Sequence, residues 1–227
     1  MNDYSKTILE EMNISPNFAQ WSVDLVQDGL TNHVVEIGCG IGRNLDALQK
    51  ISKELFASDY NQKYLDEIEK RFPNMKNNTF QWNLSEPLKK KLHVDSFFCS
   101  NVIEHIYDDK VALMNIARID SIRKGVFIVP GRNSLHNELD VSLGHYRRYD
   151  KEEFSNLLYE CGFSVNKIFT FNKIGVVGWF VQGSMLRKKT LGESNMKIYN
   201  FIFPFIKLSD HYLPFHGLSI AVLVEKR

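Results

Sequence analysis

Cysteine is scarce in this sequence, and so are long apolar runs. The three cysteines, Cys39, Cys99 and Cys161, lie far apart and form no CxxC pair, which excludes a zinc site recognisable from spacing and argues against a disulfide framework. We therefore expect no metal, and a reducing, cytoplasmic location. The longest apolar stretch runs from Ile174 to Val181, far short of the roughly 20 residues that cross a bilayer, so no transmembrane segment is predicted.

Charge is balanced rather than one-sided. The 227 residues include 28 Lys and Arg against 27 Asp and Glu, a net charge of +1. Such a chain lacks the positive field that draws proteins to nucleic acid, so no nucleic-acid partner is expected. The first residues carry Asp3, Glu10 and Glu11 where a secretory signal needs a positive flank and an apolar run. Export is not predicted.

Candidate strands and helices alternate along most of the chain. Apolar residues at helical spacing follow a first strand, and the same rhythm recurs three times, ending with a helix that Asp150 caps and Gly162 ends. This pattern predicts an α/β fold, a doubly wound and mainly parallel sheet with helices on both faces, whose ligands bind at the carboxyl ends of the strands. The predicted strands are 33–37, 55–58, 79–82, 94–100, 125–129 and 218–224.

A glycine-rich turn leaves the first strand. It reads Glu36-Ile37-Gly38-Cys39-Gly40-Ile41-Gly42, and its glycines permit a tight turn on which a ligand can lie against bare backbone. Asp59 ends the second strand, where a carboxylate can accept both hydroxyls of a ribose. The loop is GxGxG, and Arg43 occupies the place of the third glycine of a dinucleotide site. An adenosyl ligand without pyrophosphate is therefore favoured over a dinucleotide, and a dehydrogenase remains the competing interpretation.

The stretch 34–42 resembles the first motif of class I S-adenosylmethionine-dependent methyltransferases. Residues 101–106, NVIEHI, resemble the EH motif in the branch of that family containing quinone and other small-molecule methyltransferases, and residues 144–149, GHYRRY, resemble a GHxRRY segment before the sixth strand. The resemblance covers residues 20 to 170. It implies a seven-stranded Rossmann-like methyltransferase fold with S-adenosyl-L-methionine as cofactor.

The same resemblance assigns cofactor-binding residues. It implies that Gly38 and Gly40 hold the methionine end, that Glu36 lies close to the ammonium group, and that Asp59 takes the ribose hydroxyls. Trp21, upstream of the first strand, would close over the cofactor. Cys39 is read as a packing residue, since no paired histidine is evident beside it.

Five further positions complete the implied cofactor site. Tyr60 would pack on adenine, and Asn83 with the Leu84 backbone would meet its polar edge, although many members of the family carry Asp where this chain has Asn83. Ser100 and Asn101 would line the floor beneath the sulfonium.

Methyl transfer is an in-line displacement, in which the enzyme chiefly positions the acceptor and excludes water. For a hydroxyl acceptor His145 is the candidate general base, because it lies in the loop expected over the pocket and imidazole titrates near neutral pH. His105 and His136 are the fallbacks. A histidine bonded to backbone is the structural alternative for His145, and a helix-start acid with a surface histidine is the alternative for Glu104 and His105.

Arg147, Arg148 and Tyr149 are the candidate acceptor-binding residues, because a guanidinium fork fits a carboxylate or phosphate. A salt bridge from at least one arginine to Asp140 or Glu138 is the competing prediction. The segment 174–215 is dense in aromatic residues with interleaved cations. It could be a substrate lid, a membrane-surface contact, a homodimer face or ordinary packed helices.

These observations predict one methyltransferase domain over 1–227. Its parts would be a helical N-terminal cap (1–30), a cofactor-binding core (31–172), a helical aromatic insertion (173–216) and a last strand (217–227). The expected function is methyl transfer to a small-molecule or glycan-intermediate acceptor, most plausibly at oxygen. The alternatives are a methyltransferase for a quinone or lipid-linked acceptor at the membrane surface and a non-catalytic protein that binds the cofactor as a partner or sensor.

Overall fold

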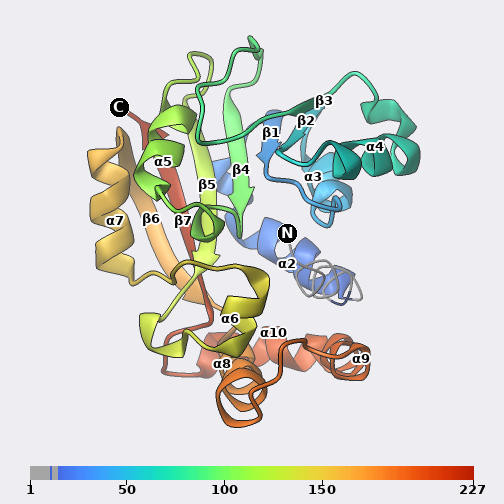
Figure 1. Ribbon diagram of the computed structural model, residues 1–227, viewed down its shortest axis with the longest axis vertical. Helices are drawn as coiled ribbons and strands as arrows, with labels where there is room; N and C mark the ends of the chain where they lie inside the picture. The colour runs from blue at the N-terminus through green and yellow to red at the C-terminus, as the bar shows by residue number, and fades with distance from the viewer. Residues whose placement is uncertain (1–10, 12–14) are drawn as a thin grey trace.

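A seven-stranded sheet forms the centre of the protein, in the order β3-β2-β1-β4-β5-β7-β6 (Figure 1). The computed structural model describes residue 11 and residues 15–227; the first part of the predicted cap lies outside these residues. The first five strands pair in parallel, whereas β7 runs antiparallel between β5 and β6. The predicted mainly parallel α/β fold is confirmed. The strands are β1 (His33–Ile37), β2 (Glu54–Asp59), β3 (Thr79–Gln81), β4 (Ser96–Ser100), β5 (Lys124–Pro130), β6 (Phe163–Phe171) and β7 (Ser219–Lys226).

Side chains of successive strand residues point to opposite faces of the sheet. Because both sets are apolar here, helices cover both faces. Val35 and Phe97 belong to one apolar cluster, with α5 (Asp109–Ala117) and α7 (Lys151–Glu160). Their neighbours Val34 and Phe98 belong to a second cluster on the other face. That face is covered by α2 (Pro16–Val26), α3 (Leu45–Ile51) and α4 (Gln62–Arg71).

The starts of the helices reflect local hydrogen bonding and the turns that precede them. Asn61 caps α4, and its side chain accepts a hydrogen bond from the Lys63 backbone. Helix α3 begins only at Leu45, after the turn that contains Ile41. Asp150 stands at the start of α7, but its carboxylate accepts a hydrogen bond from Asn133 and makes no side-chain cap.

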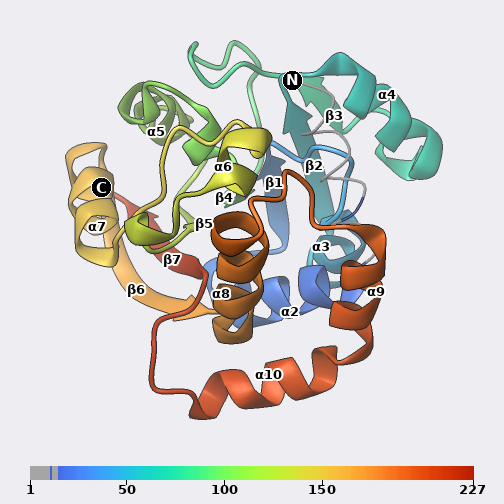
Figure 2. The same cartoon turned by 60° about the horizontal axis from the view of Figure 1, so that its bottom comes forward.

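The aromatic segment is helical. It contains α8 (Lys173–Trp179), a π-helical turn (Phe180–Met185), α9 (Glu193–Phe201) and α10 (Phe203–Tyr212). Together with α6 (Glu138–Leu143), which the sequence patterns did not reveal, these helices lie at one end of the molecule, and α10 contacts both α2 and α8 (Figure 2). Within the described part of the chain, every helix is too short or too polar to cross a bilayer.

Candidate active site

The glycine loop leaves β1 with three residues in the left-handed region. The φ angles of Gly38, Gly40 and Gly42 are +71°, +53° and +78°, which only glycine adopts at little cost. A Cβ at Gly38 would collide with Val102, whereas a Cβ at Gly40 would meet nothing within 4 Å. Gly40 therefore faces open space, as a backbone cradle for a ligand requires.

Asp59 fastens this loop to the end of β2. Its two carboxylate oxygens accept hydrogen bonds from the backbone N–H groups of Gly40 (2.8 Å) and Asn61 (2.9 Å). Burial raises the pKa of Asp59, although these backbone donors oppose the shift. The carboxylate still has lone pairs for a ribose, and it also holds the loop in shape.

Glu36 lies at the end of β1 and is 1% exposed. One carboxyl oxygen accepts a hydrogen bond from Asn44 at 2.8 Å, and the other is buried without a partner. Burial raises the pKa of Glu36 to about 8, partly offset by Asn44 and the nearby Arg43. An unpartnered buried acid is costly, and a cationic ligand group would satisfy it.

The N-terminal helix reaches the same side of the site through Phe18. The guanidinium of Arg43 lies 5.2 Å from the centre of the Phe18 ring. Trp21, expected to close over the cofactor, is instead 4% exposed and packs edge-on against Phe171 and Phe203. This is a correction: the indole anchors α2 to the core, because its ring is enclosed by apolar neighbours.

The residues expected around adenine and the sulfonium lie at the carboxyl ends of the next strands. Tyr60 is 56% exposed and free to pack on a base. Asn83 is exposed, whereas Leu84 is buried and its carbonyl accepts a hydrogen bond from Asn115. After β4 the chain turns through Asn101, whose φ is +53°.

The side chain of Asn101 donates to Ser100 at 3.1 Å. Its backbone N–H donates to the Ile128 carbonyl at 2.8 Å, which fixes the chain where it leaves β4. Val102 then packs on Gly38. The turn that follows, Ile103–His105, is thereby held beside the glycine loop.

Asp140 on α6 is the hub of the GHxRRY segment. One of its oxygens accepts hydrogen bonds from Nδ1 of His145 (2.7 Å) and Nε of Arg148 (2.9 Å). The other accepts from the Asn137 backbone (3.0 Å) and the Trp179 indole (3.1 Å). Burial opposes ionisation of Asp140, but these donors hold its pKa at about 2. The link to Trp179 was missed from sequence, since nothing local connects two residues so far apart.

Arg148 and Tyr149 are not placed for the predicted acceptor contact. Arg148 is 3% exposed, bonded to Asp140 and to the Gly131 carbonyl, with its guanidinium 4.7 Å from the Trp179 ring centre. Tyr149 is 1% exposed and donates to Asp109. Both assignments are corrected to structural roles, because the polar groups are buried and already paired. The predicted salt bridge to Asp140 is the one that Arg148 makes.

Arg147 is the most accessible of the three. Its guanidinium pairs with Asp109 at 2.7 Å and donates to the Tyr107 carbonyl at 2.6 Å. An acceptor carboxylate would have to compete with Asp109 for it.

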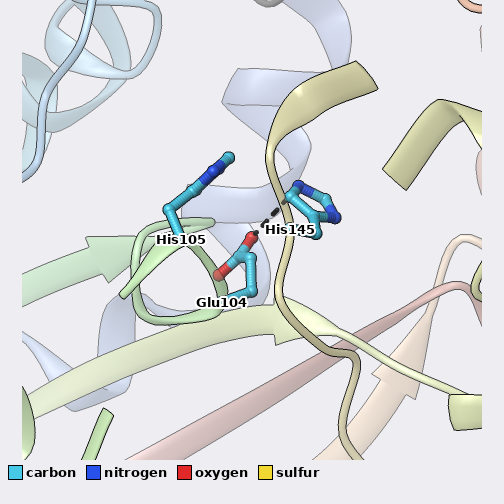
Figure 3. A group of neighbouring side chains, drawn as sticks. All are labelled: Glu104, His105 and His145. Atoms are coloured by element: carbon cyan, nitrogen blue, oxygen red, sulfur yellow. Dashed lines mark ion pairs between the residues drawn. The ribbon is translucent and has the colours of Figure 1, made fainter. Parts of the chain in front are cut away.

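Glu104, His105 and His145 lie together beside this hub (Figure 3). Glu104 is fully buried and neither carboxyl oxygen has a hydrogen-bond partner. Nε2 of His145 lies 3.9 Å from Glu104, and the rings of His105 and His145 meet edge-on with centroids 4.7 Å apart. Burial raises the pKa of Glu104 to about 8 and lowers that of His145, against the influence of Asp140. His105 is exposed, so the group opens to solvent.

Comparison with known proteins supports a methyltransferase. Residues 35–129 match the family model described as a methyltransferase domain. A probable S-adenosylmethionine-dependent methyltransferase of Mycobacterium tuberculosis is 27% identical over 138 residues, which are 57% of this chain and 48% of that protein. The chain thus spans about half the length of the curated relatives it matches.

Solved structures share the fold at low identity. A methyltransferase from Archaeoglobus fulgidus has a TM-score of 0.61 at 19% identity, covering 93% of this chain and 95% of its own. The magnesium protoporphyrin IX methyltransferase of Synechocystis PCC 6803, solved with bound S-adenosylhomocysteine, has a TM-score of 0.56 at 13% identity, covering 100% and 89%. These likenesses confirm the Rossmann-like methyltransferase fold, and residues 35–129 are similar to the methyltransferase domain of S-adenosylmethionine-dependent enzymes.

Proposed function

We propose that this protein transfers a methyl group from S-adenosyl-L-methionine to an oxygen of a small-molecule or glycan-intermediate acceptor. The observation that carries the proposal is the placement of His145. Asp140 fixes its Nδ1 as the donor, so Nε2 carries the lone pair and faces the Ile103–His105 turn next to the glycine loop. A basic nitrogen is thereby presented beside the cofactor site.

The cofactor would lie across the carboxyl ends of β1, β2 and β4. Gly38 and Gly40 would cradle the methionine end, and the free oxygen of Glu36 would receive its ammonium. Asp59 would accept the ribose hydroxyls and Tyr60 would pack on adenine. Asn83 and the Leu84 backbone would meet the polar edge of adenine, and Ser100 and Asn101 would line the floor beneath the sulfonium.

The chemical step is a displacement at the methyl carbon. The acceptor oxygen attacks in line, the new O–CH₃ bond forms as the S–CH₃ bond breaks, and S-adenosylhomocysteine leaves. Nε2 of His145 would take the proton of the attacking hydroxyl, and Asp140 would stabilise the imidazolium that results. His105 is the fallback base, and Arg147 is the remaining candidate for holding an anionic group of the acceptor.

The test begins with binding and continues with turnover. Calorimetry should show S-adenosylhomocysteine binding in preference to NAD, which would separate a methyltransferase from a dehydrogenase. A panel of phenols, catechols and sugars is then screened for release of S-adenosylhomocysteine. With an acceptor found, His145→Ala should lower the single-turnover rate by roughly 10²–10⁴, while His93→Ala, an exposed histidine outside the site, should not.

Cofactor affinity should be unchanged in both variants. A His145→Ala protein with a near-normal single-turnover rate would remove the base role, and binding without turnover on any acceptor would favour the non-catalytic alternative.

A second candidate is an acceptor at the membrane surface. The observation that favours it is the exposure of Phe201, Phe205 and Tyr212 on α9 and α10, at 81%, 72% and 74%, since clustered exposed aromatics mark interaction surfaces. Sedimentation with vesicles of anionic and zwitterionic lipid tests it, with Phe201→Ser and Phe205→Ser as the variants expected to stay in the supernatant.

A further inference from the structure

We propose that Glu104, His105 and His145 bind a divalent transition-metal cation. The inference rests on the proposed function only for what the cation would do; the site itself stands on the geometry of three side chains (Figure 3). Each offers one ligand atom, and these atoms all lie within 4.8 Å of one another.

The first observation is the buried carboxyl of Glu104. It is 0% exposed, both oxygens lack a hydrogen-bond partner, and it points toward the neighbouring imidazole (Figure 3). Burying such a group without a partner is costly, and native proteins seldom tolerate it without a ligand or a functional reason. A cation would satisfy both the charge and the lone pairs.

The second observation is the orientation of His145. Its Nδ1 donates to Asp140 at 2.7 Å, so the unprotonated Nε2 is aimed at Glu104 from 3.9 Å. Two potential ligand atoms therefore face each other without a hydrogen bond between them. Metal-binding histidines usually donate their other ring N–H to a carboxylate or carbonyl, which fixes the tautomer and raises the basicity of the coordinating nitrogen.

The donor set indicates the class of ion. Two donors on one ion at about 2.1 Å lie roughly 3 to 4 Å apart, close to the separation of His145 and Glu104. His105 is exposed, and it offers a third ligand atom within 4.8 Å of the other two. Two imidazoles and one carboxylate suit zinc, cobalt, manganese or iron rather than magnesium or calcium, and leave open positions for exogenous oxygens.

The cation would bind and activate the acceptor hydroxyl in the proposed reaction. The acceptor hydroxyl would occupy an open position, where the ion lowers its pKa and its proton passes to solvent. The resulting oxyanion attacks the methyl carbon, and S-adenosylhomocysteine leaves as before. With the ion bound, Nε2 of His145 is a ligand and no longer the proton acceptor.

Cobalt(II) is the direct probe, because its visible absorption reports nitrogen and oxygen ligands without any need for turnover. Protein stripped with a chelator is titrated with Co²⁺ and, by calorimetry, with Zn²⁺ and Mn²⁺. We expect one ion per chain, and at least about 100-fold weaker binding in His105→Ala and Glu104→Gln. His93→Ala, an exposed histidine outside the group, should bind as the unmodified protein does.

If Glu104→Gln does not fold, His105→Ala still tests the site, because His105 is exposed and its replacement should not disturb the core. Absence of a Co²⁺ spectrum at millimolar ion, or equal binding in His105→Ala, would overturn the proposal. These outcomes are separate from the fate of the proposed function, because methyl transfer that survives chelation but depends on His145 would support the direct base role instead.

Discussion

Asp140 and His145 form a carboxylate–imidazole pair at 2.7 Å, and the same Asp140 oxygen also binds Arg148 at 2.9 Å. The pair joins α6 to the GHxRRY loop and reaches α8 through Trp179. The site's imidazole is therefore oriented by a residue that is itself held from four directions, and His145 has one tautomer available while Asp140 stays ionised.

We expect Asp140→Asn to disturb both orientation and stability. The amide can accept at one atom only, so at least one of its four donors is left unpaired at a cost of about 1–3 kcal/mol. Nitrogen-15 NMR of His145 should show a mixture of tautomers where the unmodified protein shows one. Glu138→Gln, an exposed acid on the same helix, is the control, and an unchanged His145 spectrum in Asp140→Asn would contradict the positioning role.

Asp59→Ala should weaken S-adenosylhomocysteine binding by about 10- to 150-fold, since hydrogen bonds to a charged partner contribute roughly 1.5–3 kcal/mol. The loss of bonds to Gly40 and Asn61 adds a cost in stability. Calorimetry on protein whose folding has been checked by circular dichroism measures the effect. Unchanged affinity would remove Asp59 from the site.

Gly40→Val should nearly abolish cofactor binding without filling any space needed by the fold. A Cβ there meets no atom within 4 Å, so its cost in the free protein is the backbone strain at a φ of +53°. Gly144→Val is the control: Gly144 has a φ of +82° and nothing within 4 Å of an added Cβ, but it lies outside the glycine loop. Calorimetry should find affinity lost only in Gly40→Val; retained binding would undermine the loop assignment.

Cofactor affinity should rise with pH between about 6 and 8. The pKa of Glu36 is raised to about 8 in the free protein, and an ammonium ligand requires the ionised form, so affinity grows by up to about tenfold per unit below that pKa. Calorimetry in two buffers of different ionisation enthalpy should detect proton release on binding, and Glu36→Gln should bind weakly with no such dependence.

Glu36 should have the opposite effect on stability: its contribution to the free energy of unfolding should fall as the pH rises. Between pH 4.5 and about 8 native Glu36 holds a proton that the unfolded chain has lost, so its contribution to the free energy of unfolding falls as pH rises. In urea titrations without cofactor, the free energy of unfolding of Glu36→Gln should therefore increase relative to that of the unmodified protein as the pH approaches 8.5. A constant difference across this range would contradict the assignment of the shift to Glu36.

The segment 186–192 should report on closure over the acceptor. Arg187, Lys188 and Lys189 are exposed between the π-helical turn and α9, where trypsin can cut. If the aromatic segment contributes to acceptor access, cleavage there should slow when cofactor and acceptor are both present. Equal cleavage in all conditions would favour plain packing of α8 to α10.

The alternation of strands and helices, the glycine loop and the acid at the end of β2 could all be predicted from local sequence. These are local properties: an alternation of apolar periods predicts strands and helices, and a positive φ requires glycine wherever the fold places it. The end of a strand also fixes the edge at which Glu36 and Asp59 must lie. The antiparallel placement of β7 had no such local signal.

Which polar side chains remain available to a ligand depends on packing between separate elements. Arg148 and Tyr149 are as polar in the sequence as Arg147, yet burial and pairing with Asp140 and Asp109 take them out of the site. The sequence left Glu104 open between the EH motif and a helix-start acid, and only the fold shows that it is buried without a hydrogen-bond partner. Burial and hydrogen-bond pairing depend on how separate elements pack, as for Tyr149 and Asp109, which lie 40 positions apart, and no local pattern of residue types encodes which side chains meet.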